Sequence, residues 1–370
     1  MRRVFCLLLA LLSLLLCACA AKPAAQADAQ TAEEMELAYA KNFRVAFYTD
    51  GAALLTIGDG QRFLLLPEGV ETPAGLGELP VIHTPVKQVY LASSSAADLF
   101  LQAGALEAIR YSSTKADDWK LPELQAAQKR GEILYVGKYS APDYEQLLTE
   151  GCDLAVENTM ILHSPATKEK LEALGLPALI EYSSYEPHPL GRVEWVKLYG
   201  LLTGHLEEAD AFFGSQLQLF ESLEGAESTG KTVAFFHITA NGAVVVRKQA
   251  DYVTRMIELA GGETALCDLP ESENALSTVT IQMESFYRQA RDADVLIYNS
   301  TVAGDVESMD ELLSLSPLLA DFKAVQEGSV WCTEQSMFQK SSAAAGMIAD
   351  FHAILTGAGD DTLQFLHKVG

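Results

Sequence analysis

The segment from Tyr182 to Arg192 is the part of the chain richest in side chains that bind ligands. Its sequence, Tyr-Ser-Ser-Tyr-Glu-Pro-His-Pro-Leu-Gly-Arg, combines aromatic rings, a carboxylate, an imidazole and a guanidinium. Flat apolar walls suit a large planar or chelate ligand, and the Arg192 guanidinium has a fork of donors that matches carboxylate or hydroxamate oxygens. The alternative is a structural segment, in which the prolines shape a connector and Arg192 pairs with Glu186 or Glu194.

Two histidines, His188 and His237, are candidates for axial ligands of a metal centre. A lone histidine near a strand end also serves as a hydrogen-bonded loop residue, and this alternative stays open. A zinc or manganese site would need three histidines and a carboxylate, and the usable histidines are His83, His163, His188 and His237. No pair among them has the tight spacing of metal ligands, so we expect a chelated metal and no metal ion bound directly by the protein.

Three cysteines remain in the body of the chain, Cys152, Cys267 and Cys332. They are far apart in sequence and lack C-x-x-C spacing, which argues against a disulfide framework and against a zinc ribbon. Whether one pair forms a disulfide stays open.

The stretch Gly225–Thr232 matches the phosphate-loop pattern G-x-x-x-x-G-K-[ST]. A phosphate loop follows a strand and opens a helix, whereas here a helix is predicted before the stretch and a strand after it. The sequence also contains no G-x-S-x-G elbow and no H-E-x-x-H motif. It therefore indicates a binding protein that is not an enzyme, with an exported enzyme as the alternative.

The order of strand and helix patterns predicts an α/β fold with two Rossmann-like lobes joined by a long α-helix. Short apolar strands alternate with helices over 86–181 and again over 232–355. Between them, 192–202 and 205–223 are predicted as consecutive helices, with Thr203 as a candidate N-cap of the second. Asp-Gly turns within 43–66 predict an N-terminal β-hairpin or meander.

These patterns place the domain boundaries as follows. We expect a leader over 1–19, a flexible tether over 20–42, an N-terminal lobe with its leading meander over 43–190, linking helices over 191–225, and a C-terminal lobe over 226–370.

Loops at the carboxyl ends of the strands supply the predicted ligand-binding residues, because ligands of open α/β sheets lie there. These residues are Ser94, Ser95, Lys138, Tyr139, Asn158, Tyr185, His188, Arg192, His237, Arg247, Asn299 and Met337.

The N-terminus has the features of an export signal. Arg2 and Arg3 precede an apolar run over 4–16, and small residues follow Leu16-Cys-Ala-Cys19. The segment resembles a bacterial lipobox, which predicts lipidation of Cys19 and anchoring on the outer face of the cytoplasmic membrane. Cleavage at the A-x-A-like site 18–20 and a retained membrane helix are the alternatives.

The chain is strongly acidic, with 26 basic and 50 acidic side chains and a net charge of −24. Removal of Arg2 and Arg3 with the leader would bring the net charge near −26. Such a charge repels nucleic acid and anionic headgroups, so neither is an expected partner.

A series of segments occurs in an order and spacing typical of one protein family. In the first lobe they are 88–109, 136–148, 151–157 and 171–177; in the second they are 254–262, 282–284, 292–297 and 322–331. The series resembles the helix-linked, class III solute-binding proteins of bacterial ABC importers, which carry ferric siderophores, haem or cobalamin. The first loop departs from the family, which commonly has Thr-Glu where this chain has Ser95-Ala-Ala-Asp98.

The resemblance implies a monomer that captures a ferric-siderophore-type chelate between its lobes and delivers it to ABC permease subunits. Cobalamin, another corrinoid or haem is the alternative ligand, a zinc or manganese receptor is less favoured, and no cofactor is expected. By the same resemblance, Glu145 and Glu284 correspond to glutamates that dock on the permease, although acidic residues are also favoured at helix starts. A helical connection between lobes further predicts limited closure on binding.

Overall fold

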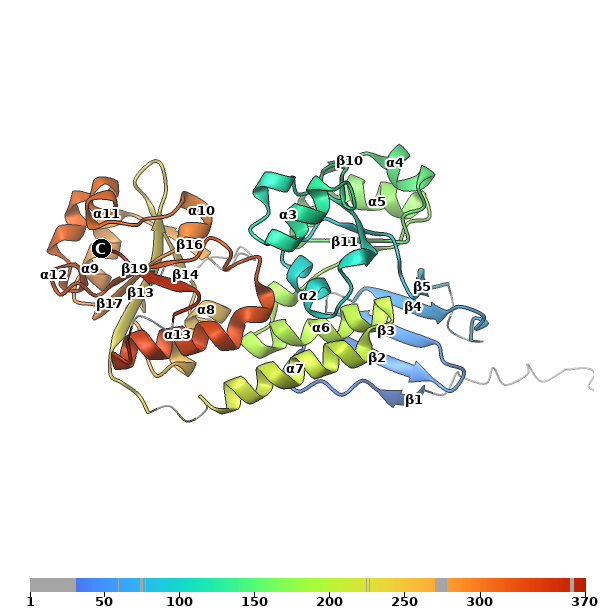
Figure 1. Cartoon of the computed structure of the whole chain (residues 1–370), viewed down its shortest axis with the longest axis horizontal. Coiled ribbons are helices and arrows are strands. Elements are labelled where there is room, and N and C mark those ends of the chain that lie inside the picture. Colours follow the sequence, from blue (N-terminus) through green and yellow to red (C-terminus); the bar gives the residue numbers. More distant parts are fainter. Residues whose placement is uncertain are drawn as a thin grey trace, which may run out of the picture.

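The computed structural model describes residues 31–370 except 59, 74, 75, 77, 224, 226, 270–277 and 360–362. The predicted leader, including Cys19, and residues 20–30 lie outside the described residues. Two α/β lobes stand side by side in Figure 1, with long helices beneath them and a separate N-terminal sheet beside those helices. Within the described ranges, no helix combines the length and the apolar character needed to cross a membrane.

The N-terminal lobe is built on a five-stranded sheet in which every pairing is parallel, with the order β12-β11-β6-β7-β8. The strands are β6 (Val89–Leu91), β7 (Ile109–Ser112), β8 (Leu134–Tyr135), β11 (Leu154–Glu157) and β12 (Ala178–Ile180). The helices are α2 (Ala96–Gln102), α3 (Pro122–Lys129), α4 (Tyr144–Thr149) and α5 (Pro165–Ala173), with short 3₁₀ turns η1 (Leu106–Ala108), η2 (Ala116–Asp118), η3 (Thr159–His163) and η4 (Ser183–Tyr185). A small ribbon pairs β9 (Gly137–Lys138) with β10 (Ala141–Pro142). Strands β6, β11 and β12 are buried along their whole length, as expected for a parallel sheet covered on both faces.

The C-terminal lobe has its own mixed sheet, with the order β16-β14-β13-β17-β18-β19 and β15 also paired to β13. The strands are β13 (Thr232–Ile238), β14 (Val244–Arg247), β15 (Glu263–Thr264), β16 (Thr278–Ile281), β17 (Val295–Tyr298), β18 (Val330–Thr333) and β19 (Leu366–Lys368). The helices are α8 (Tyr252–Leu259), α9 (Met283–Ala290), α10 (Ser300–Ala303), α11 (Met309–Leu315), α12 (Lys323–Gln326) and α13 (Ala344–Thr356), with 3₁₀ turns η5 (Pro317–Asp321) and η6 (Ser341–Ala343). Because the two sheets are separate, the predicted two-lobed α/β fold is confirmed.

The predicted N-terminal meander is confirmed and extends further than expected. The turn at Asp50-Gly51, where Gly51 has a φ of 94°, connects two strands of a five-stranded sheet. Its strands, in order, are β1 (Thr31–Glu34), β2 (Phe43–Tyr48), β3 (Ala53–Ile57), β4 (Arg62–Pro67) and β5 (Val81–Thr84). Phe43, Leu55 and Phe63 belong to the same hydrophobic core as the linking helices, so the sheet is an integral part of the fold.

The prediction of a flexible tether is wrong for residues 31–42. Strand β1 pairs with β2, and the backbone that follows is held by two buried carboxylates. Glu194 accepts hydrogen bonds from the N–H groups of Ala38, Tyr39 and Ala40, each at 2.8 Å. Glu186 accepts from the next two N–H groups and from the indole N–H of Trp195. The segment is therefore fixed along the linking helices.

The linking element consists of two helices, α6 (Pro189–Thr203) and α7 (Leu206–Glu221), as predicted. Gly204 separates them in a left-handed conformation with a φ of 81°. The predicted capping role of Thr203 is wrong, because its hydroxyl donates to the Tyr199 carbonyl at 2.7 Å. Helix α13 packs against α6, α7 and α8, and one core cluster includes residues of both lobes.

Candidate functional site

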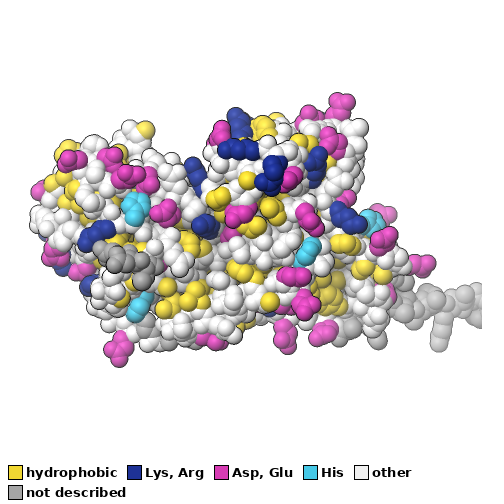
Figure 2. All heavy atoms as spheres, viewed as in Figure 1, with side chains coloured by type: hydrophobic (Ala, Val, Ile, Leu, Met, Phe, Trp, Pro, Cys, Tyr) yellow, Lys and Arg dark blue, Asp and Glu magenta, His cyan; other side chains and the backbone are white. Residues whose placement is uncertain are grey.

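In each lobe, the strand order reverses at one point, and these two points define where a ligand would lie. In the N-terminal sheet, β6 has β7 on one side and β11 on the other, so Ser94, Ser95 and Asn158 follow the strands that flank the reversal. In the C-terminal sheet, the corresponding strands are β13 and β17, which place His237 and Asn299 at the reversal. Figure 2 shows the surface hollowed between the two lobes, with Lys and Arg side chains along the hollow.

The serine loop after β6 is held in place by a buried glutamate. Ser93 and Ser95 each donate a hydrogen bond of 3.1 Å to Glu181, which is 3% exposed and also accepts from the Ser183 N–H. The Ser95 carbonyl accepts a 2.6 Å hydrogen bond from Ser341 of the other lobe. Sequence reasoning missed Glu181, although its position directly after β12 was a usable signal. The loop is consequently rigid and touches both lobes.

Arg192 lies at the junction of the lobes, at the start of α6. Its Nη2 donates to the Ser341 hydroxyl at 2.9 Å and to the Phe338 carbonyl at 3.3 Å, and the guanidinium lies 4.6 Å from the ring centroid of Tyr252. Neither Glu186 nor Glu194 pairs with it, because both carboxylates bind the backbone of residues 38–42. Arg192 is 5% exposed, and its Nε finds no hydrogen-bond partner among the described residues.

Arg247 approaches the same junction from the C-terminal lobe. It lies at the end of β14, pairs with Asp251 at 3.5 Å, and places its guanidinium carbon 4.5 Å from the ring centroid of Phe338. Phe338 therefore lies between two guanidinium groups, one contacting its carbonyl and one its ring. Met337, the preceding residue, lines a small cavity with Arg192 and Tyr252.

His237 lies on the same face of the C-terminal sheet as Arg247. It pairs with Val245, and residues two apart on a strand share a face. Burial and, secondarily, the charge of Arg247 lower the pKa of His237. The imidazole is therefore neutral at physiological pH.

His188 lies away from the strand ends, in a packed aromatic cluster. Its ring stacks on Tyr39 with centroids 4.4 Å apart and meets Phe220 edge-on, and its Nδ1 accepts from the Leu190 N–H. Burial, with a smaller contribution from Arg255, lowers its pKa to about 4. The structure gives His188 a helix-capping and packing role.

The remaining predicted ligand residues fall into separate groups. Asn158 donates to the Ala92 carbonyl at 2.9 Å, and the Tyr185 hydroxyl lies 3.3 Å from that of Thr159, so these residues form the wall beside the serine loop. Lys138 is exposed on the β9–β10 ribbon, and Tyr139 packs into the core beneath it. Asn299 is 2% exposed and caps α10 by accepting from the Thr301 N–H.

The four histidines considered for a zinc or manganese site do not form a ligand group in the described structure. His83 lies in β5 of the N-terminal sheet, His163 ends η3, and His237 is in the other lobe. A bare-ion site made by these residues is therefore contradicted.

A groove of about 450 Å³ also lies between the lobes, lined by α2, the start of α3, α7, the start of α13 and residues 364–365. It contains none of the predicted ligand residues and lies away from the carboxyl ends of the central strands. We assign the candidate site to the strand ends, where Arg192, Arg247 and the serine loop lie.

Glu145 and Glu284 are both exposed, each in the first turn of its helix, α4 in one lobe and α9 in the other. Figure 1 places α4 and α9 on the sides of their lobes that face away from the other lobe.

Comparison with curated sequences finds lipoproteins. One uncharacterized lipoprotein of Methanocaldococcus jannaschii is 24% identical over 351 residues, covering 90% of this chain and 86% of the relative. A second from the same organism is 23% identical over 335 residues, covering 82% and 77%. No family model matches the chain.

Comparison with solved structures finds binding proteins of the helix-linked class. The periplasmic haem-binding protein HutB of Vibrio cholerae superposes with a TM-score of 0.56 at 18% identity, covering 70% of this chain and 96% of that one. The periplasmic vitamin B12-binding protein BtuF of the same organism gives 0.52 at 15% identity, covering 74% and 98%. An ABC-type Fe3+-hydroxamate transport protein of Saccharomonospora viridis gives 0.55 at 17% identity, covering 73% and 93%. The chain has the fold of class III solute-binding proteins, and these neighbours are named for binding and transport, not for an enzymatic reaction.

Proposed function

We propose that this protein is the extracytoplasmic solute-binding component of an ABC importer and captures a ferric-siderophore-type chelate between its lobes. The observation that carries this proposal is the pair Arg192 and Arg247, which reach the interlobe junction from different elements and flank Phe338. Guanidinium forks bind carboxylate and hydroxamate oxygens, while the partly exposed ring of Phe338 supplies apolar surface.

Haem is a weaker candidate for the ligand than a chelate whose iron is already fully coordinated. One of the two histidines that could bind haem iron, His188, is stacked in an aromatic cluster, and its Nδ1 accepts a hydrogen bond from the Leu190 N–H. A corrinoid remains the second candidate, because the fold is shared with a vitamin B12-binding protein and a corrinoid also brings its own metal ligands.

Export and anchoring are part of the proposal. Two curated relatives are named lipoproteins, which supports lipidation of Cys19 and a position on the outer face of the cytoplasmic membrane. The protein would act as a monomer and present Glu145 and Glu284 to the two permease subunits.

Binding can be measured by quenching of Trp331 fluorescence. Trp331 belongs to the same core cluster as Phe235, and the Arg247 guanidinium lies over the Phe235 ring, so Trp331 is on the side of the sheet that carries the candidate site. Purified protein would be titrated with a ferric hydroxamate, haem and cobalamin. We expect Arg247→Lys to weaken ferric-hydroxamate binding about tenfold, because the charge remains but the fork of donors is lost. Arg255→Lys is the matched control, since Arg255 is exposed and pairs with Glu258 on the surface of α8. Absence of quenching by all three ligands would contradict the proposal.

Permease docking is tested separately by reversing two charges. The double variant Glu145→Arg, Glu284→Arg should bind the ligand as tightly as the unaltered protein, while uptake into cells is lost. Reversal of two other exposed glutamates, Glu169→Arg and Glu327→Arg, is the control and should leave uptake intact. Normal uptake by the first variant would exclude these residues as the docking contacts.

A further inference from the structure

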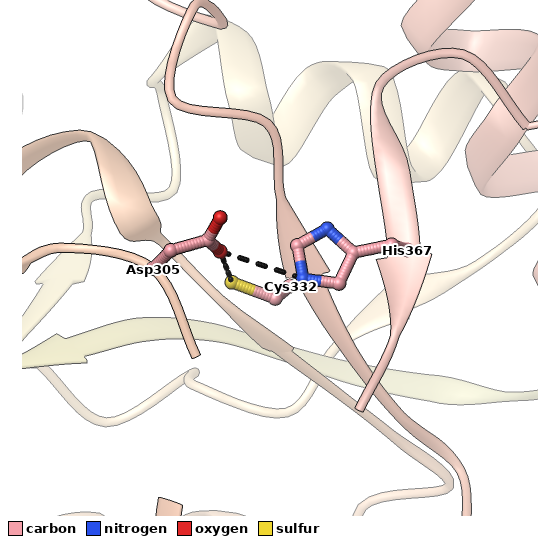
Figure 3. A group of neighbouring side chains, drawn as sticks. All are labelled: Asp305, Cys332 and His367. Carbon is pink, nitrogen blue, oxygen red and sulfur yellow. Dashed lines mark hydrogen bonds and ion pairs between the residues drawn. The ribbon is translucent and has the colours of Figure 1, made fainter. Parts of the chain in front are cut away.

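Three potential metal ligands meet in the C-terminal lobe, away from the candidate ligand site. Cys332 on β18 and His367 on β19 are directly paired residues of neighbouring antiparallel strands, and Asp305 follows α10. Asp305 Oδ1 lies 3.3 Å from Cys332 Sγ and 3.4 Å from His367 Nε2. All three ligand atoms lie within 4.8 Å of one another, and Figure 3 shows the side chains pointing toward a common point.

These separations fit a zinc ion. Zn²⁺ takes oxygen, nitrogen and thiolate ligands at about 2.0–2.3 Å in tetrahedral geometry, which sets its ligand atoms roughly 3.3–3.8 Å apart. The two separations that involve Asp305 are 3.3 and 3.4 Å, and the one between Cys332 and His367 is within 4.8 Å. The mixture of sulfur, imidazole and carboxylate also favours Zn²⁺ over Mg²⁺ or Ca²⁺, which prefer oxygen alone.

A fourth residue orients the histidine. Glu334, the first residue after β18, has Oε1 3.4 Å from His367 Nδ1. His367 Nε2 lies 3.4 Å from Asp305 Oδ1 and 3.3 Å from the Val306 carbonyl oxygen, a contact that a bound zinc ion would replace. Histidines that bind metals commonly have a carboxylate on the second ring nitrogen, which fixes the tautomer and ring orientation. Here the histidine, His367, lies on the edge strand β19, and its carboxylate partner, Glu334, follows the neighbouring strand β18.

The site is open on one side and separate from the proposed ligand site. Cys332 is fully buried, whereas the side chains of Asp305 and His367 are 33% and 30% exposed. Three protein ligands with an open side leave a fourth position for water or an external ligand. Cys332 packs in the core on one face of the C-terminal sheet, while its neighbour Trp331 and the residues near Arg247 pack on the other.

We propose that Asp305, Cys332 and His367 bind Zn²⁺, with Glu334 as the positioning residue for His367. On binding, the Cys332 thiol releases its proton to solvent and the thiolate coordinates the ion. The ion would tie β19, the last strand of the chain, to β18 and to the loop after α10. Zinc should therefore raise the unfolding temperature of the protein by mass action.

The test uses Zn²⁺ and, as a spectroscopic probe, Co²⁺ added to the purified full chain. We expect one Co²⁺ per chain with a thiolate-to-metal charge-transfer band, displaced by Zn²⁺. Cys332→Ser should abolish the band, whereas Cys267→Ser, which alters an exposed cysteine, should retain it. Glu334→Gln should weaken zinc binding by about 10–100-fold, the usual effect of removing such a carboxylate.

His367→Gln provides a second variant, because it alters a partly exposed side chain and leaves the buried Cys332 in place. It should unfold like the unaltered protein without metal and lose the stabilisation by Zn²⁺. The proposal is overturned if folded Cys332→Ser or His367→Gln binds Zn²⁺ as tightly as the unaltered protein, or if bound Co²⁺ shows no thiolate band. Neither outcome depends on a chelate binding between the lobes.

Discussion

The buried glutamates of this protein differ in whether they have hydrogen-bond donors. Glu181, Glu186 and Glu194 each accept bonds from backbone N–H groups, and these bonds compensate for burial. Glu157, at the end of β11, is 0% exposed, and neither of its carboxyl oxygens has a partner among the described residues. The hydroxyl of Tyr90, on the neighbouring strand β6, is likewise buried. Burial raises the pKa of Glu157 to about 8. Burial also raises the pKa of Tyr90, and the nearby Glu157 carboxyl adds a smaller contribution in the same direction.

Glu157 should make the folded protein less stable as pH rises. Its pKa is raised in the folded state, so between about pH 4.5 and 8 the folded chain holds a proton that the unfolded chain has released. The free energy of unfolding should therefore fall through this window by up to about 1.4 kcal/mol per pH unit. Glu157→Gln should reduce this slope, measured by urea unfolding at several pH values. The exposed Glu169→Gln should leave the slope unchanged, and an equal slope in Glu157→Gln would mean that Glu157 is ionised in the fold.

Local sequence predicted the position of several site residues but not their partners. The rule that loops at strand ends carry ligands placed Ser95 and Arg247 correctly at the interlobe junction, because it depends only on strand order. It failed for His188, whose ring is covered by Tyr39, a residue almost 150 positions earlier. It also could not show that Glu194 holds residues 38–40, since that contact depends on the packed position of the N-terminal segment.

Helices α6 and α7 cross at a glycine. A Cβ at Gly200 would lie 2.5 Å from the Ala209 Cβ and 2.7 Å from the His205 carbonyl oxygen. A Cβ at Gly214 on α7 would have no atom of another described element within 4 Å. The first glycine thus allows close helix approach, whereas the second has no packing reason to be glycine.

The two glycines should respond in opposite directions to the same substitution. Gly200→Ala should lower the free energy of unfolding by about 1–3 kcal/mol, because the added methyl forces the helices apart. Gly214→Ala should raise it by about 0.5–1 kcal/mol, because alanine favours the helix. Urea unfolding of both variants checks this, and an unchanged midpoint for Gly200→Ala would mean that the helices can separate at no cost.

Elements with strong periodicity were predicted well, and edge elements were not. Strand β17 and helix α13 belong to the alternation of strands and helices predicted over 232–355. Strands β1 and β19 lie at sheet edges, where few side chains are buried and the pattern is weak. Residues 31–34 include no apolar residue larger than alanine, so their sequence resembles a tether, and their pairing with β2 comes from the available edge of that strand.

The lobes touch directly as well as through the linking helices. Ser341 donates to the Ser95 carbonyl, the Ser342 N–H donates to Asp98 at 2.8 Å, and Gln339 bonds the backbone at Lys120 and Asp118. Beneath these contacts, one hydrophobic core continues from the N-terminal sheet to α13. The molecule therefore has two polar contact points and an apolar base that oppose separation of its lobes.

This arrangement predicts that ligand binding changes the overall dimensions only slightly. Compact packing of a chain of this length gives a radius of gyration of about 20 Å, and we expect a ferric hydroxamate to change it by less than about 1 Å. Gln339→Ala removes the contact with residues 118 and 120, so it should increase the radius without ligand and enlarge the change on binding. Gln326→Ala is the control, because Gln326 bonds only within the C-terminal lobe. Solution scattering measures the radius of gyration of all three proteins. The packed helices α6 and α7 are the main connection between the lobes, so a large contraction of the unaltered protein would show that these helices bend.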